Sequence, residues 1–178
     1  MIDVHCHLNF HSFEKDYDGV IKNAFEAGVT KIINVGTKID SSKLAVELAQ
    51  KYENLYAIVG VHPHHADKIS QCHPEFISGS RSRNKFGMTG KRSDDWIKQL
   101  ETLARIPKVV GIGEIGMDFF SYKSNDIVNP KLQKGVFIKQ IGLAHKLKLP
   151  LQIHNRLAGA EILETLSDPA ASAVLSYR

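Results

Sequence analysis

Two histidines one residue apart, His5 and His7, are the first residues of the sequence whose types and spacing could do chemistry. They lie in the stretch IDVHCHL at residues 2–8. In a β-strand alternate side chains share a face, so Asp3, His5 and His7 would point to the same side. Two imidazoles on one face can bind a metal, but an isolated H-x-H is also typical of a solvent-exposed edge strand. The pair therefore indicates a metal site only if other parts of the chain supply further ligands.

Such ligands follow the ends of other predicted strands. Short β-branched runs alternate with longer amphipathic stretches, which is typical of β-α units that form a parallel sheet. Strands are predicted at residues 1–5, 29–36, 55–62, 108–116 and 149–154, and a weaker one at 172–177. In parallel α/β folds, functional residues gather at the carboxyl ends of the strands. At these ends the sequence has His5 and His7, then His62 to His65, then Glu114 and Asp118, and finally His154 and Arg156.

Imidazole or carboxylate at four strand ends predicts a divalent cation site on the rim of an α/β fold. A single histidine is more often a core or loop residue, but four such groups on one rim are hard to obtain by accident. Mixed nitrogen and oxygen ligands suit Zn²⁺, Mn²⁺ or a similar ion, and a carboxylate can bridge two ions. Two cysteines, Cys6 and Cys72, lie outside any C-x-x-C motif, which argues against a disulfide framework or a thiolate zinc site.

The composition indicates one globular domain, with 43% hydrophobic and 24% charged residues among 178. The sequence has neither an apolar run of about 18 residues nor a basic leader followed by a hydrophobic stretch, so we expect no membrane contact and a cytoplasmic location. The net charge of +4 resides in residues 71–92, which hold five basic residues and one acid. This Gly-, Ser- and Arg-rich segment breaks the β-α spacing and resembles translated repeat elements. We interpret it as an inserted, basic and disordered loop within a single domain of residues 1–178.

Several motifs occur in an order that resembles the TatD family of metal-dependent deoxyribonucleases. They are DVHCHL at 3–8, VGVHPH at 59–64, GEIGMDFF at 113–120, the helix of 133–149 and LPLQIHNRLA at 149–158. The family has a (β/α)8 barrel with a pair of divalent metal ions at its mouth. The resemblance implies an incomplete barrel of this type here, with five to six parallel strands and intervening helices.

The resemblance also implies roles for single residues. His5 and His7 would bind the first metal ion, Glu114 would bridge both ions as the catalytic carboxylate, and His154 would bind the second. His62 and Arg156 would contact a phosphate of the DNA substrate. The two ions, Mg²⁺, Mn²⁺ or Zn²⁺, would activate a water molecule for attack on phosphorus. Asp3 would orient a metal-binding histidine.

Two expected family ligands are absent, namely a histidine on the sixth strand and an aspartate on the eighth. Residues 176–178 read Ser-Tyr-Arg where the sixth-strand histidine is expected. A barrel of this kind needs about 250 residues. We therefore expect a C-terminally truncated chain, weak or inactive alone, that could be complemented by a separately encoded C-terminal half.

Two other functions remain open from the sequence. An early D-x-H-x-H also occurs in PHP-type phosphoesterases, although GEIGMD followed by IHNR favours the TatD type. A non-catalytic fragment that binds metal or nucleic acid through its basic segment and histidines is the third possibility.

We predict that deleting residues 71–92 leaves the free energy of unfolding unchanged or slightly higher, because loop length costs only about 0.6 kcal/mol per doubling. Thermal and urea unfolding would measure this, with a Gly/Ser linker of equal length as the matched control. A large fall in melting temperature for both variants would mean that the segment packs on the domain. Loss of nucleic-acid binding on deletion would favour the binding-fragment hypothesis.

Overall fold

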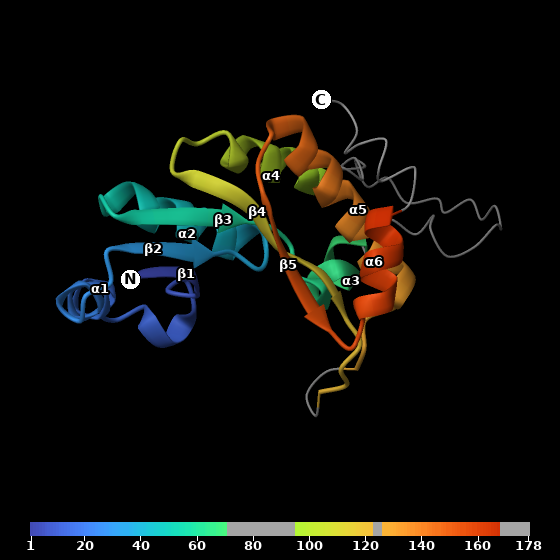
Figure 1. Ribbon diagram of the computed structural model, residues 1–178, viewed down its shortest axis with the longest axis horizontal. Helices are drawn as coiled ribbons and strands as arrows, with labels where there is room; N and C mark the ends of the chain where they lie inside the picture. The colour runs from blue at the N-terminus through green and yellow to red at the C-terminus, as the bar shows by residue number, and fades with distance from the viewer. Residues whose placement is uncertain (71–94, 123–125, 168–178) are drawn as a thin grey trace, which may run out of the picture.

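The computed structural model describes residues 1–70, 95–122 and 126–167 of the chain. Helices and strands alternate along these residues, as the sequence predicts (Figure 1). The predicted strand at 172–177 and the segment 71–92 lie outside the described residues. The strands are β1 (Ile2–Cys6), β2 (Lys31–Val35), β3 (Leu55–Val59), β4 (Val109–Asp118) and β5 (Leu151–Arg156).

Six α-helices and two 3-10 helices connect or follow the described strands. None of these helices is long and apolar enough to cross a membrane. The α-helices are α1 (Tyr17–Glu26), α2 (Ile39–Lys51), α3 (Ala66–Ser70), α4 (Asp95–Ala104), α5 (Pro130–Leu147) and α6 (Gly159–Ser167). The 3-10 helices are η1 (His11–Phe13) and η2 (Pro63–His65).

The five strands form one parallel sheet in the order β1-β2-β3-β4-β5, and this sheet is curled into half of a barrel. Each strand pairs with its predecessor in the sequence. The edge strands also approach each other, because the Gln152 side-chain amide of β5 donates to the Val4 carbonyl of β1 at 3.0 Å. The carboxyl ends of all five strands therefore converge on one rim, and the predicted partial barrel is confirmed.

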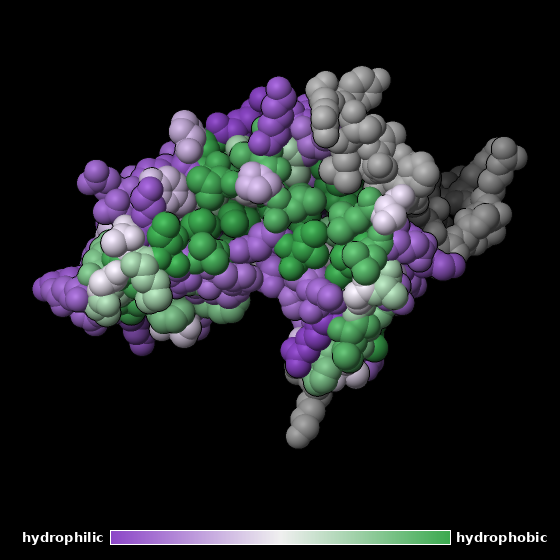
Figure 2. All heavy atoms as spheres, in the orientation of Figure 1, coloured by the Kyte–Doolittle hydropathy of each residue, from purple (hydrophilic) through white to green (hydrophobic). Residues whose placement is uncertain are grey.

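One face of the sheet is packed against α2, α4 and α5, while the other face is partly exposed among the described residues. Ile32, Leu55 and Val109 are buried under these helices, whereas their strand neighbours Ile33, Tyr56 and Val110 are only half-buried. Figure 2 shows a broad apolar area in the middle of the face that carries β5 in front. The edge strands contribute exposed apolar side chains, namely Ile2, Val4 and Ile153.

Local residue preferences in the sequence predict three helix ends, with Gly28 as a C-terminal cap, Asp40 as an N-cap and Pro130 as a first helical residue. Two of these predictions are confirmed and the one for Asp40 is wrong. Gly28 follows α1 with a φ of 92°, and Pro130 opens α5 directly after Asn129, whose side chain accepts from the Lys131 N–H at 2.9 Å. Asp40, the predicted cap of α2, lies inside the first turn of the helix. Ser41 satisfies that end instead, because its Oγ accepts from the backbone N–H of Lys38 at 3.0 Å.

The helical spacing of apolar residues in the sequence predicts a buried face of α5 made of Leu132, Val136, Ile141, Ala144 and Leu147. Ile141 and Ala144 are buried as predicted. Leu132, Val136 and Leu147 are only half-buried, while two glutamines, Gln133 and Gln140, are fully buried. These glutamines are seven residues apart, so they lie on the same side of the helix. Their contacts explain why polar side chains are tolerated there.

Each buried glutamine pairs with both main-chain groups of one residue at a strand end. The Gln140 amide accepts from the Val61 N–H at 2.7 Å and donates to the Val61 carbonyl at 3.0 Å. The Gln133 amide does the same for Asp118, at 2.8 and 2.9 Å. Val61 lies beyond the last paired residue of β3, and Asp118 pairs with Arg156 of β5 but has no partner in β3. The helix thus supplies main-chain partners on the side where the pairing of β3 with β4 has ended, next to His62 and Asp118.

A close backbone approach sets the position of β5 beside β4. Gly116 pairs with His154 in the parallel ladder and has a φ of +136°, and a Cβ atom there would lie 2.1 Å from the His154 carbonyl oxygen. Only glycine adopts this conformation without strain. The spacing between Glu114 and His154 therefore depends on the missing side chain at residue 116.

We predict that Gly116→Ala lowers the free energy of unfolding by at least about 2 kcal/mol, since the variant combines backbone strain with a steric clash. Gly135→Ala is the matched control, because Gly135 lies exposed in α5 with open space where a Cβ atom would lie, and should raise stability by about 0.5–1 kcal/mol. Thermal unfolding would measure both effects. A Gly116→Ala variant as stable as the unmodified chain would contradict the proposed backbone constraint.

Candidate metal centre

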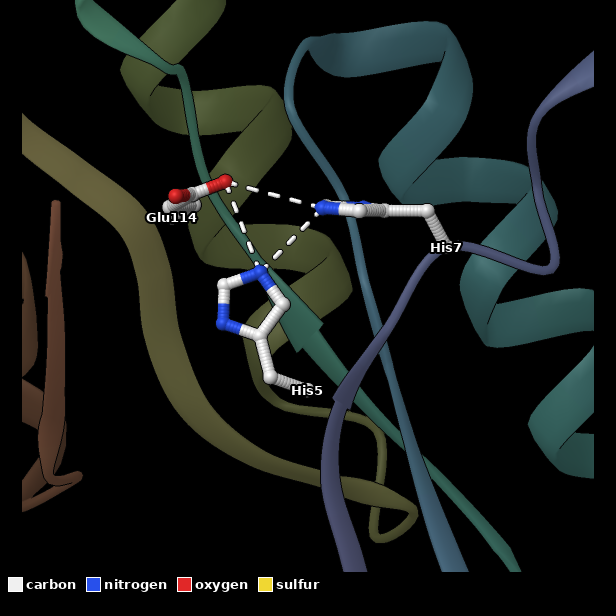
Figure 3. A group of neighbouring side chains, drawn as sticks. All are labelled: His5, His7 and Glu114. Atoms are coloured by element: carbon white, nitrogen blue, oxygen red, sulfur yellow. Dashed lines mark hydrogen bonds and ion pairs between the residues drawn. The ribbon is translucent and has the colours of Figure 1, made fainter.

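Three of the predicted ligands converge at the rim of the sheet and form the first candidate metal group (Figure 3). The Nε2 atoms of His5 and His7 are 3.2 Å apart, and each is 3.7 Å from Oε2 of Glu114. A triangle with these sides has a circumradius of about 2.1 Å, which matches the bond lengths of Zn²⁺ to imidazole and carboxylate. The three donor atoms therefore fit a single divalent ion.

Local contacts fix the orientation of His7 before any ion binds. Its Nδ1 lies 2.9 Å from the Val35 carbonyl, which requires a proton on Nδ1 and leaves the lone pair of Nε2 facing Glu114. The ring stacks on Phe10 with centroids 4.4 Å apart and planes 6° from parallel. Asp3 differs from its predicted role of orienting an imidazole, because its carboxylate accepts from the backbone N–H of His5 at 3.0 Å.

Glu114 connects this group with a second one. Its other oxygen, Oε1, lies 2.8 Å from Nδ1 of His154 and 4.0 Å from Nε2 of His62. On the far side of the ring, Nε2 of His154 lies 2.9 Å from Oδ2 of Asp118. His62, Asp118 and His154 form the second candidate metal group, whose ligand atoms lie within 4.8 Å of one another.

The charges of this cluster are coupled through His154. Its hydrogen bond with Glu114 is the main cause that raises the pKa of His154 above the ordinary value, and the bond with Asp118 adds to it against the effect of burial. Burial opposes ionisation of Glu114, but the hydrogen bond with His154 and the neighbouring imidazoles lower its pKa below the usual value. The two carboxylates thus favour the charged form of the imidazole that lies between them.

His62 and His154 differ in the direction in which the site moves their pKa values. Burial lowers the pKa of His62 to about 3. Its Nδ1 accepts from the His64 N–H at 3.2 Å, so the proton resides on Nε2, which points toward Glu114 and the ring of His154. A neutral imidazole with a fixed N–H can donate to an oxygen of a bound substrate without adding charge.

Arg156 lies at the rim, where two aromatic rings hold its guanidinium. The guanidinium carbon is 3.9 Å from the ring centroid of Phe120 and 5.0 Å from that of Tyr122, and Nη1 donates to the Tyr122 hydroxyl at 2.7 Å. Such stacking leaves further N–H groups of the fork available for a phosphate. Arg156 is exposed, whereas His62 is buried.

The structure brings His5, His7, His62, Glu114 and His154 together around one rim. A pocket of about 650 Å³ opens beside them, lined by His7, His62, Glu114, His154 and neighbouring residues. Asp118 and His64 follow predicted strands, but their positions in the sequence indicate no role for them, and nothing in the sequence points to Phe10 or Tyr122. No motif distinguishes these two aromatic residues from ordinary loop residues before the fold is known.

A curled parallel sheet with histidines and a carboxylate at its carboxyl rim defines a parallel α/β half-barrel with a candidate metal site. A family model described as TatD related DNase matches residues 2–176, and the chain belongs to this family.

Relatives of known name and structure agree with this assignment. An uncharacterized metal-dependent hydrolase, YabD of Bacillus subtilis, is 33% identical over 175 residues, which are 98% of this chain and 58% of the relative. The 3'-5' ssDNA/RNA exonuclease TatD of Salmonella typhimurium is 31% identical over 95% of this chain and 54% of the relative. The crystal structure of YjjV, a TatD homolog from Escherichia coli, superposes with a TM-score of 0.70 at 30% identity, covering 93% of this chain and 54% of that one. The chain spans about half the length of the relatives it matches.

We predict that the His5→Ala, His7→Ala double variant binds divalent metal far more weakly than the unmodified chain, because two of three converging donors are lost. Titration calorimetry with Zn²⁺ and Mn²⁺ and elemental analysis after dialysis would measure this. His11→Ala is the matched control, since His11 follows the same strand but is 91% exposed and pairs with Glu14. Equal metal content in the double variant and the control would contradict the assignment.

Proposed function

We propose that this chain carries the N-terminal part of a metal-dependent phosphodiesterase that cleaves DNA. The observation that supports it most is the convergence of His5 and His7 on the one carboxylate that also contacts His154. Membership of the TatD related DNase family and a relative named as a single-stranded DNA and RNA exonuclease favour a nucleic-acid substrate.

We propose two divalent ions, Mg²⁺, Mn²⁺ or Zn²⁺, as the cofactors. His5 and His7 would hold the first, His154 the second, and Glu114 would bridge them through its two oxygens, which face the two groups separately. Bound ions of this kind polarise a phosphoryl oxygen and acidify a water molecule. The donor set of imidazole and carboxylate suits all three ions, with Zn²⁺ favoured by the number of nitrogen ligands.

The protein side chains would bind and orient the scissile phosphate. The neutral His62 would donate its Nε2 proton to a phosphoryl oxygen and exclude water from the buried side of the pocket. Arg156, stacked on Phe120 and hydrogen-bonded to the Tyr122 hydroxyl, would contact a neighbouring phosphate at the exposed edge. Both groups are fixed before substrate binds, so little side-chain freedom is lost on binding.

We further propose a single domain of residues 1–178 interrupted by a dispensable segment at 71–92, and a separately made C-terminal half as a possible partner. The half-length match to relatives and the partly exposed inner face of the sheet support such a partner. The cytoplasmic location stays a prediction. A PHP-type phosphoesterase has less support, because the family match covers residues 2–176.

We predict slow phosphodiester cleavage by the 178-residue chain. Among the described residues, no carboxylate with a free oxygen lies beside Glu114 to take the proton of a water, a role worth roughly 10²- to 10⁴-fold in rate. Cleavage of 5'-labelled single-stranded DNA with Mg²⁺, Mn²⁺ or Zn²⁺ would measure it. Glu114→Gln and His62→Ala should abolish the residual rate. Addition of a C-terminal half from a complete relative should raise it.

Each outcome of this experiment has a distinct meaning. Fast cleavage that is lost in Glu114→Gln would support the nuclease and show that the chain itself supplies the base. Cleavage that survives Glu114→Gln and metal chelation would refute the proposed site. DNA binding that depends on residues 71–92, with no cleavage under any condition, would favour a non-catalytic binding fragment. His11→Ala, distant in role from the site, controls for effects of purification.

A further inference from the structure

Asp118 accepts hydrogen bonds from four groups, although the proposed function gives it no role. Its side chain is fully buried, and Oδ2 lies 2.9 Å from Nε2 of His154, 2.9 Å from Nε2 of His64 and 3.2 Å from the Tyr122 hydroxyl. Its Oδ1 accepts from the Phe120 N–H at 2.9 Å. A buried carboxylate costs free energy unless it is hydrogen-bonded, and here four donors surround it.

We propose that Asp118 is a positioning residue that turns His154 so that Nδ1, and not Nε2, faces the metal centre. This inference rests on the proposed function, in that His154 is taken to bind an ion. Of the two ring nitrogens, Nε2 points to Asp118 and Nδ1 to Oε1 of Glu114, the carboxylate that completes the first metal group. A carboxylate that accepts from one nitrogen keeps the proton there and leaves the lone pair on the other.

The contacts of Asp118 argue against its own use as a metal ligand. Both oxygens already accept hydrogen bonds, so an ion would displace the donors of His64, His154 and Tyr122 from a buried site. Glu114, by contrast, accepts from few donors and directs Oε2 toward His5 and His7. The backbone of Asp118 is also fixed at both groups by Gln133, which suits a residue that orients others.

Asp118→Asn tests the orienting role, because asparagine has nearly the same size and shape as aspartate but can present a donor instead of an acceptor to His154. In Asp118→Asn the side-chain oxygen can still accept the hydrogen bond from the Phe120 N–H. The amide nitrogen then presents N–H donors to His154. A donor opposite Nε2 stabilises the tautomer with its proton on Nδ1, which cannot bind an ion. The expected result is a 10- to 100-fold weaker affinity for Zn²⁺, roughly the range found when such supporting carboxylates are removed.

The experiment combines calorimetry with ¹⁵N spectra of the histidine rings. In the unmodified chain loaded with Cd²⁺, coupling to the metal should appear at Nδ1 of His154, whose signals are identified by their loss in His154→Ala. In Asp118→Asn the proton should shift to Nδ1 and the coupling should vanish. Tyr122→Phe is the control, because it removes one donor from Oδ2 without changing the partner of His154, and its Zn²⁺ affinity should stay within a factor of three.

The possible results are distinguishable. Cd²⁺ coupling at Nε2 in the unmodified chain, or unchanged Zn²⁺ affinity in a folded Asp118→Asn variant, would overturn the inference. Loss of one whole equivalent of metal with His154 still coupled would mean that Asp118 is itself a ligand. Unchanged metal binding in His154→Ala would refute the proposed function and not only the role of Asp118. If Asp118→Asn does not fold, the Cd²⁺ coupling in the unmodified chain still tests the inference, because it shows whether Nδ1 or Nε2 of His154 binds the ion.

Discussion

The site depends on two buried side-chain amides in α5 that pair with the main chain where β3 and β4 end. Beyond its last ladder bond, a strand has unpaired N–H and carbonyl groups, and an unpaired buried group costs about 1–3 kcal/mol. Gln140 satisfies both groups of Val61 and Gln133 both groups of Asp118. The helix face that packs on the sheet therefore also sets the positions of His62 and of the Asp118 carboxylate. A change in how α5 packs would change the geometry of the site.

Electrostatics provides the second constraint, because the charged form of His154 and the charged forms of Glu114 and Asp118 stabilise one another. Glu114 and Asp118 lie on opposite sides of the His154 ring, and each stabilises the charged imidazole. The ring in turn favours the ionised form of both carboxylates. A divalent ion can replace that single positive charge beside Glu114 while His154 keeps its bond to Asp118. The metal-free protein thus already has the charge pattern and the orientations that an ion requires.

Much of this arrangement follows from the sequence, and its limits have physical causes. β-branched runs predict all five described strands, and the rule that parallel strands end on one rim brings His5, His7, Glu114 and His154 together without any coordinates. The predicted capping role of Asp40 is wrong because α2 begins earlier, at Ile39, where the Ser41 hydroxyl accepts from the backbone N–H of the N-cap residue Lys38. Hydrophobic periodicity cannot predict the burial of Gln133 and Gln140, because both side chains are polar. Their burial is stable only because their amides bond main-chain groups at the ends of β3 and β4, which are distant in the sequence. The contacts of Asp118 and Tyr122 likewise depend on loop positions that no local pattern encodes.

Curvature of the sheet is what turns a row of strand ends into a metal centre. β1 and β4 are separated by two strands, and in a flat sheet with a spacing of about 4.8 Å their axes would be roughly 14 Å apart. Side chains that stand perpendicular to such a sheet could not meet, yet Nε2 of His5 lies 3.7 Å from Oε2 of Glu114. The curl that closes this distance also brings β5 toward β1, as the contact between Gln152 and Val4 shows. An ion bound by His5 and Glu114 would bind only the curled form, and would therefore stabilise the barrel-like curvature together with the site.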